Sequence, residues 1–139
     1  ARAAKLARET TTLVLGNGDV ESLADLVLRV RETHVHGALI GRGALGNPWI
    51  FLQKERAKEQ VRNAGLDIPS CEAALEERFR VALEHARHFE ALGGAPRFAA
   101  MRKHLGWYCK GFFKAAEVRS QMFRTTNSCD VERVLAGII

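Results

Sequence analysis

The 139-residue sequence lacks any apolar run close to the roughly 20 residues that a membrane-spanning helix needs. Its first residues show no secretory signal pattern. It has only three cysteines, Cys71, Cys109 and Cys129, an odd number, far apart and without a C-x-x-C pair. This pattern argues against a disulfide scaffold or a structural zinc site. We therefore expect a reducing, cytoplasmic setting and no membrane partner.

The sequence also lacks a recognisable catalytic or metal-binding constellation. Its five histidines share no metal-ligand spacing. His85 and His88 are three residues apart on a predicted helix, but no third ligand is apparent, so we place them at the surface or its boundary. No Ser-His-Asp or Cys-His arrangement stands out. We therefore expect no metal site and no catalytic residue in this chain.

Positive charge is present in excess and is unevenly spread. The net charge is +5 and the sequence pI is about 9.5. Residues 97–124 hold seven Lys or Arg against one acid, Glu117, which gives this window a net charge of +6. A basic block of this kind indicates a polyanionic partner, and the alternative is a solvated basic surface.

The most informative stretch is HGALIGRGALGNPWIF at residues 36–51. Residues 37–40 are a short apolar run that predicts a buried strand. A glycine-rich turn follows at residues 41–46. Asn47 and Pro48 then signal a helix start, with Asn47 as the cap and Pro48 at the first helical position.

The turn at residues 41–46, GRGALG, has the composition of a phosphate-binding loop. Glycines let the backbone approach a ligand closely, and Arg42 supplies a cation beside free main-chain amides. The alternative is a tight strand-to-helix turn that binds nothing. The turn also matches G-x-G-x-x-G, but a Rossmann fingerprint requires a following βαβ unit, and this chain continues as helices.

The first 50 residues predict two successive strand–helix units. A helix end at residues 2–9 precedes a strand at 10–15, the turn GNGD at 16–19 and a helix through Val30, for which Asp19 is placed as the cap. Strand–helix–strand order predicts parallel strands, as in a Rossmann-type sheet or a slice of a (β/α)8 barrel. Two consecutive phosphate-type turns favour the last two units of a TIM barrel.

The remainder predicts helices only. A helix at 48–64 ends before Gly65, and residues 66–69 form a short linker, so we place the domain boundary between an α/β part, 1–65, and a helical part, 66–139. Apolar residues at helical spacing then mark a packed face: Leu75, Phe79, Ala82, Ala86 and Phe89. Further helices are expected from Pro96, over 115–123 and over 130–138, the last capped by Ser128 or Asp130. Together they predict a small bundle of about four helices.

The predicted helix that starts at Pro96 has two contrasting faces. Its apolar stripe is formed by Phe98, Met101, Leu105 and Tyr108. The 100° step per residue places Arg102, Lys103 and Lys110 opposite that stripe, where three cations make a usable surface for a phosphate backbone. Trp107 lies off the stripe, and is either a base-stacking residue or a partly buried structural one.

Three motifs carry a resemblance to a known family. They are GNGD at residues 16–19, GRGALGNPW at 41–49 and MRKHLGWYCKG at 101–111. In order and spacing they resemble the bacterial tRNA-dihydrouridine synthases, over essentially the whole chain. The resemblance implies a (β/α)8 barrel followed by a helical tRNA-binding domain. It also implies reduction of the uridine 5,6 double bond in tRNA by FMN, which NADPH recharges.

The resemblance also assigns cofactor contacts to this chain. The residues that match the family's FMN-binding positions are Asn17, Gly18, Asp19, Gly41 and Arg42. Because the Asp19 carboxylate would repel a phosphate that it faced, we expect Asp19 to contribute through its backbone or as a helix cap. Phe112–Lys114 depart from the Pro-Gly that family members usually carry, which changes the turn there.

The resemblance further implies what this chain does not contain. The family's catalytic cysteine lies on an earlier barrel loop, and none of the three cysteines here lies in that motif. The chain also begins with Ala1 rather than Met, so we expect the end of a longer protein, without its N-terminal barrel residues. Two alternatives stay open: a non-catalytic RNA-binding helical module, or another FMN-dependent TIM-barrel oxidoreductase.

Overall fold

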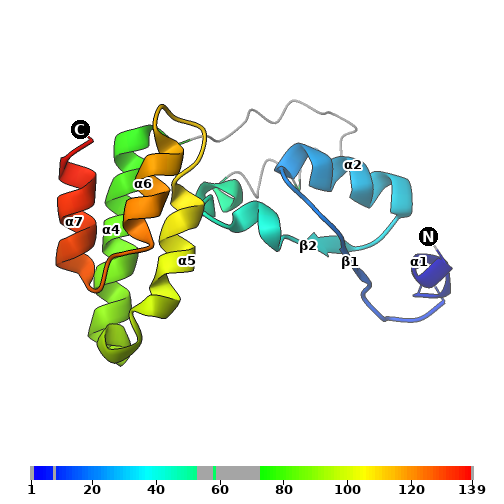
Figure 1. Cartoon of the computed structure of the whole chain (residues 1–139). Helices are drawn as coiled ribbons and strands as arrows, with labels where there is room; N and C mark the ends of the chain where they lie inside the picture. The colour runs from blue at the N-terminus through cyan, green and yellow to red at the C-terminus, as the bar shows by residue number, and fades with distance from the viewer. Residues whose placement is uncertain (1, 8, 53–57, 59–72, 139) are drawn as a thin grey trace. The chain divides into compact units, whose positions relative to one another are not determined.

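The computed structural model describes residues 2–7, 9–52, 58 and 73–138, which divide into two compact units. The α/β unit, Ala1–Glu72, holds a two-stranded sheet, and the helical unit, Ala73–Ile139, contains four α-helices (Figure 1). The predicted linker and boundary lie outside the described residues. So does most of the helix predicted at 48–64. The chain is thus mostly helical with a small parallel sheet.

The α/β unit alternates strands and helices in the predicted order. Its elements are α1 (Arg2–Ala7), β1 (Leu15–Asn17), α2 (Leu23–Thr33), β2 (Gly37–Leu39) and two 3₁₀ turns, η1 (Arg42–Ala44) and η2 (Pro48–Phe51). The two strands are parallel, with Leu15 opposite Gly37 and Asn17 opposite Leu39. The parallel pairing confirms the prediction from strand–helix–strand order. It places the turns after β1 and β2 at the same edge of the sheet.

The first strand is shorter and later than predicted. It begins at Leu15 rather than at residue 10, and it extends through Asn17. Regular pairing is limited by β2, which is only three residues long. The Thr10 hydroxyl instead donates to the Ala7 carbonyl, at 3.2 Å, in a turn that follows α1. The β-branched composition of residues 10–14 therefore does not suffice to form a strand where no partner strand faces them.

The helix starts of the α/β unit also differ from the prediction. Ser22 caps α2, because its hydroxyl accepts the Asp25 amide at 3.1 Å, so the assignment of Asp19 as the cap was wrong. Pro48 does start a helical segment, but that segment is the 3₁₀ turn η2, and the Asn47 side chain makes no capping hydrogen bond. A small core of Leu23, Val27 and Ile50 packs α2 against this part of the chain.

The helical unit confirms the predicted apolar stripes. Its elements are α4 (Leu75–Phe89), η3 (Glu90–Gly94), η4 (Ala95–Arg97), α5 (Ala99–Tyr108), α6 (Ala115–Met122) and α7 (Ser128–Ala136). The predicted stripe of the second helix is buried in full: Phe98, Met101, Leu105 and Tyr108. Gly93 and Gly111 adopt positive φ angles of 81° and 72°, as residues that end helices commonly do.

The last helix starts two residues earlier than predicted and has a different cap. The Asn127 side chain accepts the Asp130 amide at 2.8 Å, so Asn127 is the cap rather than Ser128 or Asp130. The Asp130 carboxylate instead accepts hydrogen bonds from the Thr126 amide and hydroxyl, which lower the pKa of Asp130. Within the described residues, no helix is long and apolar enough to cross a membrane.

A candidate phosphate pocket and a candidate RNA-binding surface

The turns that follow β1 and β2 line an open pocket of about 360 Å³. Its lining residues are Asn17, Gly18, Asp19, Leu39, Gly41 and Arg42. The structure therefore brings together all five residues to which the family resemblance assigns cofactor contacts. The sequence missed Leu39, the last residue of β2. Its place near the end of the predicted strand, two residues before Gly41, is the signal that could have identified it.

Gly18 and Gly43 require glycine for different reasons, whereas Gly41 borders open space. Gly18 has a φ angle of 147°, which L side chains rarely adopt. A Cβ added at Gly43 would lie 2.2 Å from the Val20 carbonyl oxygen, so the turn packs directly on the chain before α2. A Cβ added at Gly41 would meet nothing within 4 Å. The space beside Gly41 is thus open to a ligand.

Asp19 and Arg42 form an ion pair across the two turns. Both side chains are exposed, Asp19 by 62% and Arg42 by 78%. An exposed pair of this kind contributes little to stability. A guanidinium carries five N–H donors, so Arg42 retains donors for a second anion while it contacts Asp19.

Arg29 holds the same turn from the side of α2. Its Nη2 donates to the Asp19 carbonyl oxygen at 3.3 Å, and its Nε contacts the Asp25 carboxylate at 2.6 Å. The hydrogen bond and charge of Asp25 raise the pKa of Arg29. The role of Arg29 at this turn was not predicted from the sequence. The spacing of Asp25 and Arg29, one helical turn apart, would have predicted their pairing but not the contact to Asp19.

The three basic residues of the predicted RNA-binding face have different environments. Lys103 is exposed on α5, and Lys110 is exposed beyond the end of that helix. Arg102 is half-buried, and its Nε donates to the carbonyl oxygen of Thr125, a buried residue, at 2.8 Å. The prediction that all three project from one solvent-facing helix side was therefore wrong for Arg102, which is half-buried, and for Lys110, which lies beyond the helix. The turn before α7 covers that residue.

A cluster of rings lies between α4 and α5. The His85 Nδ1 lies 3.3 Å from the Tyr108 hydroxyl, and the His85 and His104 rings are 5.5 Å apart. Trp107 is half-buried and stands edge-on to His104, at 4.7 Å. Burial is the main cause that lowers the pKa of both histidines. The rings of His85, His104, Trp107 and Tyr108 thus pack against one another between the two helices. Among the described residues, no group of three or more possible metal ligands occurs.

The two described cysteines differ in burial. Cys109 is buried, its thiol donates to the Leu105 carbonyl, and burial raises its pKa to about 11. A thiol with such a pKa is protonated at neutral pH and is a poor nucleophile. Cys129 is exposed on α7, far along the chain from the pocket-forming turns.

Comparison with known proteins places these features in a family. The dihydrouridine synthase (Dus) family model matches residues 1–136. A probable tRNA-dihydrouridine synthase from Mycobacterium leprae is 32% identical over 124 residues, 88% of this chain and 31% of that protein. The tRNA-dihydrouridine synthase B of Xanthomonas campestris is 35% identical over 112 residues, 80% of this chain and 32% of that protein.

The chain belongs to the dihydrouridine synthase family, whose match covers nearly all of it. It spans about a third of the length of the curated relatives that it matches. Both of these relatives are named as tRNA-dihydrouridine synthases.

Proposed function

We propose that the full-length protein is a tRNA-dihydrouridine synthase that reduces uridine to 5,6-dihydrouridine in tRNA, with FMN as cofactor and NADPH as reductant. The residues of this chain would hold the FMN phosphate and part of the tRNA. The observation that carries this assignment is the convergence of Asn17, Gly18, Asp19, Gly41 and Arg42 on one pocket. Family membership supplies the reaction type.

The residues around the pocket fit the phosphate end of FMN. Open space beside Gly41 admits a ligand next to the backbone, and Arg42 offers charge-assisted hydrogen bonds. The Asp19 carboxylate already faces Arg42, so it orients the guanidinium rather than meeting the phosphate itself. FMN, when bound, supplies the hydride chemistry. The residues of this chain would bind and orient the cofactor through its phosphate.

The α/β unit fits the end of a TIM barrel. Two parallel strands joined by a helix, each followed by a turn that contributes to one pocket, are what barrel units seven and eight supply. We therefore propose that residues 1–65 complete such a barrel. In the helical domain, residues 66–139, we propose that Lys103 and Lys110 bind tRNA phosphates, with Arg102 contributing both to the fold and to the charge of that surface.

Replacement of Arg42 by alanine in the full-length protein tests the phosphate assignment. Loss of a charge-assisted contact worth about 1.5–3 kcal/mol should weaken FMN binding by roughly 10- to 150-fold. Flavin fluorescence quenching during titration of the apoprotein measures this. Arg87→Ala is the matched control, because Arg87 also forms an exposed ion pair, with Glu132. Equal FMN affinity of both variants would contradict the assignment.

The absorbance spectrum of the purified full-length protein separates the enzyme from the non-catalytic alternative. A bound flavin with its visible bands is expected for the synthase. An RNA-binding module without cofactor would bind tRNA and show no flavin bands.

A further inference from the structure

The corner between α5 and α6, residues 111–114, contains two adjacent phenylalanines in opposite environments. Phe112 is half-buried and packs edge-on against Phe79, with ring centroids 5.4 Å apart. Phe113 is 86% exposed, the highest value of any aromatic residue in the described part of the chain. Phe112 therefore anchors the corner in the core, whereas Phe113 contributes almost nothing to the packing of the helical unit.

The backbone of the corner has a defined shape. Gly111 and Lys114 both adopt left-handed conformations, with φ angles of 72° and 61°. A left-handed lysine is uncommon and costs free energy, so the turn is held by its surroundings. This geometry brings the Lys114 ammonium 5.7 Å from the centroid of the Phe113 ring. The corner thus displays an aromatic ring and a cation together.

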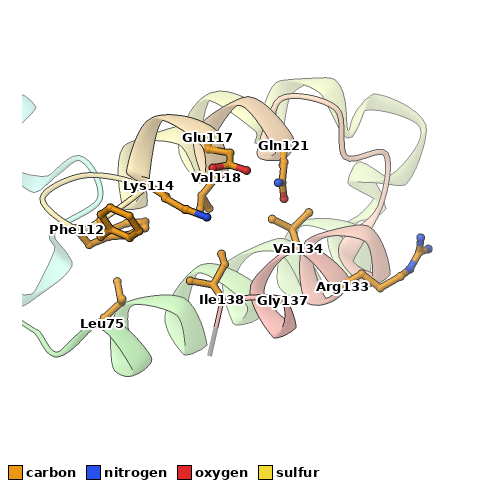
Figure 2. Close-up of a pocket in the computed structure, with 11 residues that line it drawn as sticks. Leu75, Phe112, Lys114, Glu117, Val118, Gln121, Arg133, Val134, Gly137 and Ile138 are labelled. Carbon is orange, nitrogen blue, oxygen red and sulfur yellow. The ribbon is translucent and has the colours of Figure 1, made fainter.

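A pocket of about 540 Å³ opens beside this corner, between α6 and α7 (Figure 2). Its α6 side carries the polar side chains of Glu117 and Gln121, and its α7 side carries Val134 and Ile138. Arg133 points away from it, toward Asp130. The volume lies within the range of roughly 300–1,000 Å³ typical of small-molecule sites. Apolar walls beside hydrogen-bonding groups suit a planar heteroaromatic ring.

We propose that this corner and pocket form a binding site for an unpaired nucleobase of RNA. Phe113 stacks on the base, Glu117 or Gln121 hydrogen-bonds to its edge, and Lys114 contacts the adjacent phosphate. The inference rests on the proposed function, because it adds a base contact to the phosphate contacts on tRNA.

Charge and chemistry favour RNA over other occupants of this site. The window of residues 97–124 carries a net charge of +6, which complements a polyanion. Aromatic stacking is sequence-tolerant and is the usual means by which proteins hold unstacked bases. A lipid surface would use the cation and the ring, but it gives no role to Glu117 and Gln121, which line the same pocket.

Three variants of Phe113 in the full-length protein test the site, with a mixture of unmodified tRNA transcripts as the probe. Stacking is worth about 1–3 kcal/mol per base, so Phe113→Ala should weaken tRNA binding by roughly 5- to 150-fold. Phe113→Leu should weaken tRNA binding as much as Phe113→Ala does, because leucine has no ring to stack on a base, although it keeps much of the apolar area. Phe113→Trp should retain binding. The salt dependence should stay unchanged, because none of the three removes a charge.

The same titrations distinguish the possible failures. Wild-type affinity in both the Ala and the Leu variant, with tRNA still bound, would overturn the base site and leave the proposed function intact. Retained binding by Phe113→Leu alone would overturn stacking in favour of simple apolar contact. An equal loss on fully duplex RNA, or loss of binding to anionic lipid vesicles without loss on tRNA, would also overturn it. A wild-type protein that binds no tRNA would refute the proposed function itself.

Discussion

The two units differ in how well each buries its own apolar residues. In the helical unit the large apolar side chains at the centre are fully buried: Phe79, Met101, Leu105 and Met122. In the α/β unit several leucines are more than half exposed: Leu13, Leu15, Leu39 and Leu52. The described part of the α/β unit has a small core around Val27, but its sheet has only two strands. The most exposed apolar side chains of the helical unit, Leu92 and Phe113, lie between its α-helices, whereas exposed leucines of the α/β unit lie on and beside its strands.

This difference follows from the two kinds of structure. Helices satisfy their backbone groups internally and need only one apolar face covered. Parallel strands need neighbours on both edges and cover on both faces. Exposed leucines on and beside β1 and β2 are what a slice of a larger sheet would show, which agrees with the proposed barrel. The pocket-forming turns therefore sit on the less complete of the two units.

The largest expected effect tests the packed core of the helical unit. Phe79 is 2% exposed and contacts Phe112, so Phe79→Ala should destabilise this unit by about 3–5 kcal/mol. Urea unfolding followed by circular dichroism measures the change. Phe113→Ala is the matched control and should shift the free energy of unfolding by less than about 0.5 kcal/mol. Similar losses for both would show that the exposed ring supports the fold.

The contrast between the units also explains what could be predicted from the sequence. The stripe at Phe98, Met101, Leu105 and Tyr108 is a local, periodic signal, and the structure confirms it in full. The strand at residues 10–15 was misplaced because strand ends depend on the partner strand, which sequence periodicity does not show. The predicted helix caps were wrong for a similar reason. Several polar residues near each helix start can accept a hydrogen bond from the first free amides, and the side-chain geometry decides which of them does so.

In the candidate site, too, the local features could be predicted from the sequence and the contacts between distant segments could not. The five pocket residues could be named from the glycine turns and the family resemblance, because such turns are local signals. The partners of these residues could not be named. The Asp19–Arg42 pair and the contact from Arg29 to the Asp19 carbonyl join segments 10 to 23 residues apart, and only the fold brings them together. The exposure of Phe113 likewise depends on which of two adjacent rings enters the core.

Substitution of two glycines in the α/β unit tests its folding and its ligand binding separately. Gly43→Ala places a Cβ against the Val20 carbonyl, a backbone atom that cannot move freely, and should cost about 2–3 kcal/mol. Gly41→Ala projects into open space and should leave stability within about 0.5 kcal/mol, while the methyl group weakens FMN binding. Thermal unfolding and FMN titration of the full-length protein measure the two effects. The proposed pocket fails if Gly41→Ala binds FMN as the wild type does.

The smallest expected effect concerns two neighbouring cations of α5, which differ in burial although both belong to the predicted RNA-binding face. Arg102→Ala removes the hydrogen bond to the Thr125 carbonyl and should cost about 1–2 kcal/mol of stability. Lys103 is exposed, so Lys103→Ala should change stability by less than about 0.5 kcal/mol. If Lys103 contacts a tRNA phosphate, its loss should also reduce the salt-dependence slope of tRNA binding by roughly 0.7–0.9.

Filter binding at several salt concentrations, beside urea unfolding, measures both properties for each variant of this pair. Phosphate contacts position the RNA without reading its sequence, so the loss should be the same whichever uridine is the target. Arg102→Lys is the informative third variant: it keeps the charge but cannot reproduce the guanidinium geometry at Thr125. It should therefore lose stability while keeping the salt slope. An unchanged slope in Lys103→Ala would remove that residue from the RNA surface. An unchanged stability in Arg102→Ala would show that the hydrogen bond to the Thr125 carbonyl does not support the fold.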